Sequence, residues 1–190
     1  MLFFTSDLHF GHINAIKFSK RQFSDIEEMN EGLINNINET VMKEDELWIL
    51  GDFAYQINME EARSLREKIV CRNVHLICGN HDLDYTQDHF FQSVSTYKEM
   101  MTDYGRLVLF HYPIYEWNAA NYGSIHLHGH IHSTGEYNVE NLHKRYMDRL
   151  PIAHFPKCEE LSLRIYDVGV DANDFRPISI ERMSLSPKAE

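Results

Sequence analysis

Five short apolar segments of the chain are each followed by residues that commonly bind metal ions. The side chains are carboxylates, imidazoles and an amide, without a thiolate among them. Such a set suits Mn, Fe, Zn or Ni and argues against a structural zinc site built on cysteine. There are too many candidates for one ion, which favours two ions bridged by a carboxylate, a device used for displacement at phosphorus. The candidates are Asp7, His9, Asp52, Asn80, His81, His111, His130 and His132.

The apolar segments themselves predict the elements that position these residues. They are short, rich in branched and aromatic residues, and end in turns or loops, as buried strands do. Ligands of open α/β sheets bind beyond the carboxyl ends of the strands, so the candidates should meet at one rim. In extended chain, residues i and i+2 point the same way, which would pair Asp7 with His9, and also His130 with His132 if their stretch stays extended. The predicted strands cover residues 2–5, 47–50, 74–78, 107–110 and 125–128.

The order of these motifs resembles the calcineurin-like metallophosphoesterases. The family pattern is DxH, GD, GNH followed by Asp or Glu, a lone His, and GHxH, and all five parts occur between residues 7 and 132. Taken singly, a Gly-Asp is usually a turn and a lone His is usually a surface residue, so the weight lies in the joint pattern. Two further stretches, 10–14 and 168–177, resemble a small bacterial and phage subgroup. The resemblance implies an α/β fold with two packed mixed β-sheets flanked by helices, here as a single domain over residues 1–190.

The resemblance also implies a role for each candidate. Asp7, His9 and His132 would hold the first metal, Asn80, His111 and His130 the second, and Asp52 would bridge them. We expect two divalent transition-metal ions per chain, manganese first, with iron, zinc or nickel as alternatives. His81 would not ligate a metal. It would donate a hydrogen bond to the phosphate or a proton to the leaving oxygen.

Several other residues lie near these motifs. His12 could reach the substrate phosphate or be an ordinary surface residue. Arg21 could contact an anionic substrate, although a solvated arginine is the more ordinary expectation. Asp171 could support the site or cap a turn. The remaining histidines of interest are expected to pack or lie outside the site: His75, His126, His128, His143 and His154.

One departure from the motifs of the superfamily narrows the class of substrate. Phosphoprotein phosphatases carry an Asp, which orients the catalytic His, and a phosphate-gripping Arg shortly after the Gly-Asp. This chain has Tyr55 and Gln56 in that stretch instead. A phosphoprotein phosphatase is therefore disfavoured, the phosphodiesterase-like members are closer, and what orients His81 stays open.

Composition sets broader bounds. The chain has 190 residues and 43% hydrophobic content, ordinary for one globular domain. Its formal net charge of −11 and scattered basic residues disfavour long nucleic acid as a partner. No run is long enough for a membrane span or a signal peptide, so we expect no membrane contact and a cytoplasmic location. The three cysteines form no CxxC and are expected to be reduced.

The rest of the chain predicts two amphipathic helices and an insertion. Ser24 with Glu27 reads as a capping box before an apolar stripe from 26 to 41, and Asn58 with Glu61 begins a second helix. Residues 133–160 contain glycine and proline, which interrupt regular structure, and charges of both signs. We expect them to form a loop and helix insertion that could be a lid or an oligomer contact.

These observations support one function and several alternatives. The expected activity is a metal-dependent phosphoric ester hydrolysis by in-line attack of a hydroxide held between the metals. A phosphodiesterase on a small phosphorylated metabolite or nucleotide is expected. A phosphomonoesterase or nuclease of the same fold is the alternative, and an inactive protein-docking scaffold is a third, disfavoured because no ligand is missing.

Overall fold

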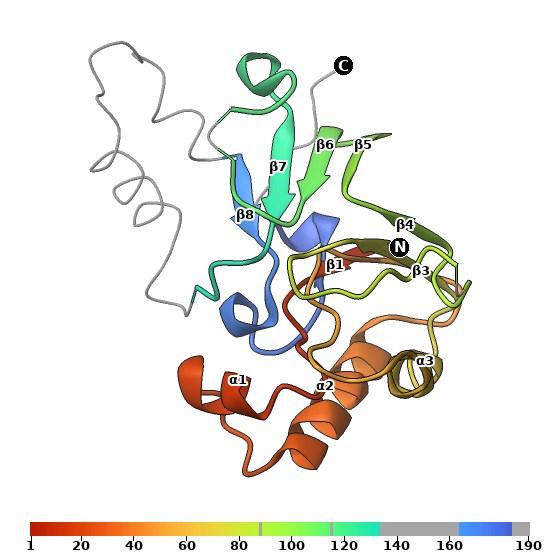
Figure 1. Cartoon of the computed structure of the whole chain (residues 1–190). Helices are drawn as coiled ribbons and strands as arrows, with labels where there is room; N and C mark the ends of the chain where they lie inside the picture. The colour runs from red at the N-terminus through yellow and green to blue at the C-terminus, as the bar shows by residue number, and fades with distance from the viewer. Residues whose placement is uncertain (88, 115, 134–163, 184–190) are drawn as a thin grey trace.

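The structure is a computed structural model that describes residues 1–87, 89–114, 116–133 and 164–183 (Figure 1). Two β-sheets pack against each other, and helices lie on the outer side of the first sheet. This arrangement confirms the predicted fold class. The expected insertion over residues 133–160 lies outside the described residues, except for Ser133.

The first sheet has five strands in the order β4-β3-β2-β1-β9. The first four run parallel and β9 pairs antiparallel to β1. Their bounds are β1 Leu2–Thr5, β2 Glu46–Ile49, β3 Asn73–Ile77, β4 Ser93–Ser95 and β9 Ile178–Ser179. Three of the predicted strands fall here, each within one residue of its predicted bounds.

The second sheet has four strands in the order β5-β6-β7-β8. Here β6, β7 and β8 are parallel and β5 is the antiparallel edge. The bounds are β5 Tyr97–Thr102, β6 Gly105–Phe110, β7 Ile125–His128 and β8 Ile165–Asp167. Each sheet is therefore mostly parallel with one antiparallel edge strand.

Alternating side chains of the first sheet supply two apolar layers. Phe4 and Trp48 point toward the second sheet, where they meet Leu107 and Leu127. Their chain neighbours point the other way, toward the helices. Parallel strands covered on both faces read as continuous apolar runs, which is why the strands were recognisable in the sequence.

Among the described residues, three α-helices connect strands of the first sheet: α1 Ile13–Phe18 and α2 Ile26–Thr40 between β1 and β2, and α3 Met59–Glu67 between β2 and β3. The predicted capping box at Asn58 and Glu61 is present. The one predicted at Ser24 is wrong, because Asp25 is the N-cap and its side chain accepts the Glu28 N–H. The six-residue α1 was not predicted, being too short to show a periodic apolar stripe.

The cysteines and the hydrophobicity of the helices were the subject of two further expectations. Cys71 and Cys78 carry free thiols, while Cys158 lies outside the described residues. No helix of the described residues is long and apolar enough to cross a membrane.

Candidate metal centre

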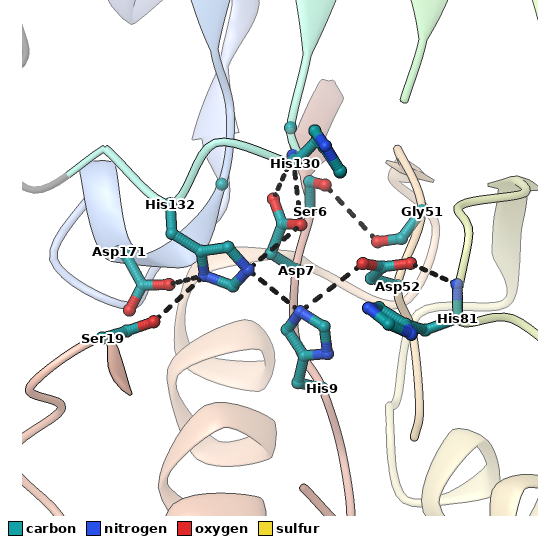
Figure 2. A network of polar contacts seen from close by, with 12 residues as sticks. Ser6, Asp7, His9, Ser19, Gly51, Asp52, His81, His130, His132 and Asp171 are labelled. Carbon is teal, nitrogen blue, oxygen red and sulfur yellow. Dashed lines mark hydrogen bonds and ion pairs between the residues drawn. The ribbon is translucent and has the colours of Figure 1, made fainter. Parts of the chain in front are cut away.

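The candidate ligands follow the carboxyl ends of strands from both sheets. Figure 2 shows five of them close together: Asp7, His9, Asp52, His130 and His132. Beyond their ends, the segments that follow β1 and β2 stay hydrogen-bonded to each other. Asp7 N–H donates to Gly51 O at 3.0 Å, and His9 N–H donates to Asp52 O at 2.9 Å. This pairing brings two ligand-bearing loops side by side.

The second sheet is joined to this rim by the Gly129 turn. The His130 N–H donates to both carboxylate oxygens of Asp7, at 3.1 and 3.0 Å. A Cβ on Gly129 would collide with Ser6 Oγ and Asp7 Oδ2, so only glycine permits this approach.

The ligand segments do not have the extended backbone expected from the sequence. Their φ values lie in the left-handed region: Asp7 57°, His9 53°, Asp52 55°, His130 73° and His132 46°. The condition for pairing His130 with His132, an extended stretch between them, is therefore not met. Kinks at alternate residues separate them and send each to a different part of the site.

Two groups of side chains could each hold an ion. The atoms that could ligate lie within 4.8 Å of one another in the groups Asp7, His9, His132 and Asp7, Asp52, His111. The His130 ring lies 5.1 Å from the His111 ring, centroid to centroid, on the side of the second group. Asn80 joins the same group, with its Oδ1 3.1 Å from His111 Nε2.

Asp7 belongs to both groups, and Asp52, a member of the second, also approaches the first. Its Oδ2 is 3.5 Å from His9 Nε2 and 3.5 Å from His111 Nε2. Its Oδ1 accepts the His81 N–H at 3.0 Å. One carboxylate oxygen thus faces an imidazole nitrogen from each group.

The proton on His111 tests whether the donor set fits a cation. His111 Nδ1 donates to Leu50 O at 2.8 Å, so a neutral ring presents a lone pair at Nε2. Burial lowers the pKa of His111, although the Asp52 charge opposes the effect. Its Nε2 lone pair then faces oxygen acceptors of Asn80 and Asp52, and an ion at this point would satisfy all three.

The donor atoms of the first group, Asp7, His9 and His132, also fit a cation. Burial lowers the pKa of His9 to about 2 and raises that of Asp7 to about 7. Burial therefore opposes charge on both groups, and a bound cation would offset this cost for the carboxylate. His9 Nε2 lies 3.1 Å from His132 Nε2.

His81 lies beside these groups and belongs to neither. It is exposed, its ring is 5.6 Å from the His9 ring, and the Tyr55 ring stands at 4.8 Å with an interplanar angle of 87°. The His12 ring lies 4.0 Å from the Tyr55 ring, centroid to centroid. Tyr55 therefore borders His81 at the point where an orienting Asp is missing.

The structure corrects the expectation for Arg21. The residue is 4% exposed, so it is not solvated, and its guanidinium is bound by Asp171 and by the carbonyls of Asp7 and Leu8. It lies beneath the ligands and is not available to a substrate. Asp171, left open by the sequence, accepts from His132 Nδ1. No motif spacing links positions 21 and 171, and only the fold brings them together.

The other histidines are placed as expected where they are described. His126 and His128 are buried in the second sheet, and His75 stacks on Trp48. His143 and His154 lie outside the described residues.

Comparison with known proteins agrees with this site. The family model of the calcineurin-like phosphoesterase superfamily domain matches residues 1–146, and the chain belongs to this superfamily. Of particular relatives, an uncharacterized protein, MJ1445, from Methanocaldococcus jannaschii is 29% identical, over 95% of this chain and 87% of its own length. The gene 66 protein of Mycobacterium phage L5 is also 29% identical, over 68% of this chain and 76% of its own.

A solved structure shares the fold across almost the whole chain. The protein of unknown function AQ665 from Aquifex aeolicus superposes with a TM-score of 0.70 and 22% identity, covering 96% of this chain and 97% of its own. The superfamily indicates a metal-dependent phosphoesterase, and the ligand groups above are consistent with that class.

Proposed function

We propose that this protein is a phosphodiesterase that acts on small phosphoesters with two divalent metal ions. The observation that carries the proposal is the position of Asp52 Oδ2, 3.5 Å from an imidazole nitrogen of each ligand group. A carboxylate so placed suits two ions better than one. Asp7, His9 and His132 would hold the first ion, and Asn80, His111 and His130 the second.

When bound, such ions supply Lewis acidity toward the phosphoryl group and the attacking water. The chain's own residues then orient the substrate. His81 is exposed at the rim and its backbone is fixed by the bond from its N–H to Asp52. Its ring can donate to a phosphate oxygen or give a proton to the leaving oxygen. His12 borders the same space and is a candidate contact for the phosphate.

Metal content tests the first part of the proposal. Protein loaded with manganese and freed of excess ions should contain two Mn per chain by elemental analysis. Chelation should abolish phosphoester hydrolysis. Asp52→Asn should lose both the activity and the second ion, because a neutral amide is a poor bridge between cations. A wild-type stoichiometry that never exceeds one would contradict the two-metal proposal.

Substrate preference tests the second part. The phosphate group of a diester carries one negative charge, and that of a monoester carries up to two. Arg21, a candidate substrate contact in the sequence, is bound by Asp171 and cannot balance the extra charge. Tighter ground-state binding of the monoester without an equal gain in the transition state would not raise its rate. We expect a higher kcat/KM for an aryl phosphodiester than for the matching monoester at equal manganese loading. The opposite ranking would refute the diesterase assignment and leave the metal site standing.

A further inference from the structure

A buried ion pair lies directly behind the candidate ligand His132. Arg21 and Asp171 have side chains that are 0% and 1% exposed. Arg21 Nε and Nη2 donate to the two carboxylate oxygens of Asp171, each at 2.9 Å. A buried pair needs its remaining polar atoms satisfied as well, and here both partners have further contacts.

Asp171 uses its remaining capacity on the His132 ring. His132 Nδ1 lies 2.7 Å from Asp171 Oδ2, and Ser19 Oγ lies 3.2 Å from the same nitrogen (Figure 2). A carboxylate accepts only, so Nδ1 carries a proton, and in the neutral ring Nε2 presents its lone pair. That Nε2 points toward His9 and Asp7.

Arg21 uses its remaining donors on the backbone of the first ligand segment. Its Nη2 donates to Asp7 O at 2.6 Å and its Nη1 donates to Leu8 O at 3.0 Å. The segment it holds has left-handed φ values at Asp7 and His9. One guanidinium therefore fixes both the peptide bonds that carry two ligands and the carboxylate that orients a third.

We propose that Arg21 and Asp171 are positioning residues of the first metal site, acting through His132 and the Asp7–Leu8 backbone. The proposal rests on the proposed two-metal function. It adds that the affinity of the first metal site depends on Asp171, which lies beyond the segment matched by the family model, residues 1–146. Partners of this kind typically contribute about 10- to 100-fold in metal affinity.

Calorimetric titration of the metal-free protein with Mn²⁺ tests this directly. Asp171→Asn should weaken the first site by about 10- to 100-fold and leave the second site at its wild-type affinity. Asp45→Asn is the matched control, since Asp45 is a buried carboxylate that binds the Met1 amino group and the Met42 N–H far from the ligands. The control should bind both ions as the wild type does.

The arginine is tested by a milder change. Arg21→Lys keeps the positive charge and loses the planar set of guanidinium donors. An ammonium group cannot donate to two carboxylate oxygens and two carbonyls in one plane. It should weaken the first site selectively and offers the test should Asp171→Asn not fold. Arg66→Lys is its control, because Arg66 is a buried arginine that donates to the carbonyls of Ile69 and Cys71.

A second measurement separates this proposal from the proposed function. Nitrogen-15 NMR of the metal-free protein should show the His132 proton on Nδ1, and Asp171→Asn should shift that tautomer equilibrium. The wild type could bind no second ion while Asp171→Asn still shifts the His132 tautomer equilibrium. That result contradicts the two-metal function and supports the positioning role. Folded Asp171→Asn and Arg21→Lys variants that bind both ions normally would overturn the positioning role alone.

Discussion

Left-handed backbone is concentrated at the residues that would bind metal. Eleven non-glycine residues of the described chain have positive φ, and five of them are proposed ligands. Such a conformation costs an ordinary L-residue roughly 1–2 kcal/mol, although Asp and His tolerate it better than most. Strain of this kind persists only where surrounding contacts enforce it. Here those contacts are the bonds between the loops after β1 and β2.

At the same scale, His81 should affect rate more than metal binding. His81→Ala removes an exposed ring that belongs to neither ligand group. We expect two bound Mn per chain and a loss of roughly 100-fold or more in kcat, the size typical of an acid catalyst. Elemental analysis and steady-state kinetics on the same sample provide the check. Loss of an ion with little loss of rate per remaining holoenzyme would show that the assigned role is wrong.

His126 gives a pH dependence that is independent of the metal ligands. Burial lowers its pKa to about 3 from 6.5, so between these values the unfolded chain binds a proton that the folded chain excludes. Folded stability attributable to this group is complete above pH 6.5 and is lost as the pH falls toward 3. His126→Gln should therefore gain stability relative to wild type by roughly 1.4 kcal/mol per pH unit below 6.5. Urea unfolding in chelator at several pH values measures this, and a difference that does not vary with pH would contradict it.

The residue types and their order were enough to predict which side chains would meet, but not how. Strand-end position predicted that Asp7 and His111 would share a rim, and the structure places them in one candidate group together with Asp52. Backbone kinks were invisible, because left-handed φ at Asp or His leaves no periodic signal. The Arg21–Asp171 pair was equally hidden, since its members are 150 residues apart and joined only by tertiary packing.

At the scale of elements, the loops after β2 and β3 are tied together by one carboxylate. Asp82 Oδ2 accepts the N–H groups of Gly79 and Asp52, and its Oδ1 accepts the Phe53 N–H, each at 2.8 Å. Glycine at 79 is needed because a Cβ there would lie within 2.6 Å of the Asp52 nitrogen. These bonds set the position of the proposed bridging residue relative to Asn80.

Asp82→Asn should therefore weaken both the fold and the site. An amide replaces one acceptor oxygen with a donor that faces backbone N–H groups, so we expect a loss of roughly 2–4 kcal/mol in the free energy of unfolding. Mn²⁺ affinity should fall as well. Asp84→Asn is the control, because Asp84 is exposed and bonds only locally to Thr86. Equal stabilities for the two variants would show that the three bonds do not hold the loops.

At the scale of the whole molecule, the carboxyl-terminal segment completes both sheets. The strand β8 pairs with β7, and β9 pairs with β1. Val168, Ile180 and Met183 lie in the apolar layer between the sheets. The sequence predicted the two-sheet class through the family resemblance, but gave no sign of β9, which is only two residues long.

A chain ending at residue 146 contains all seven proposed ligands and should still fail to form the site. Without β8, β9 and Asp171, the layer between the sheets is open and His132 has lost its carboxylate partner. Circular dichroism and Mn²⁺ titration should show loss of cooperative unfolding and of tight binding. A chain ending at residue 183 keeps both sheets and serves as the control. Two-site binding by the shorter chain would refute this view of the carboxyl-terminal segment.

The pairing of β1 with β9 also constrains when the molecule can fold during its synthesis. Phe3 and Phe4 leave the ribosome some 175 residues before their antiparallel neighbours Ser179 and Ile178. At about 5–20 residues per second, this gap lasts on the order of ten seconds or more. Throughout that time one edge of β1 has no partner, and long-range pairing is slow to form. Nascent chains are therefore expected to depend on holding factors, and metal capture should be among the last events of maturation.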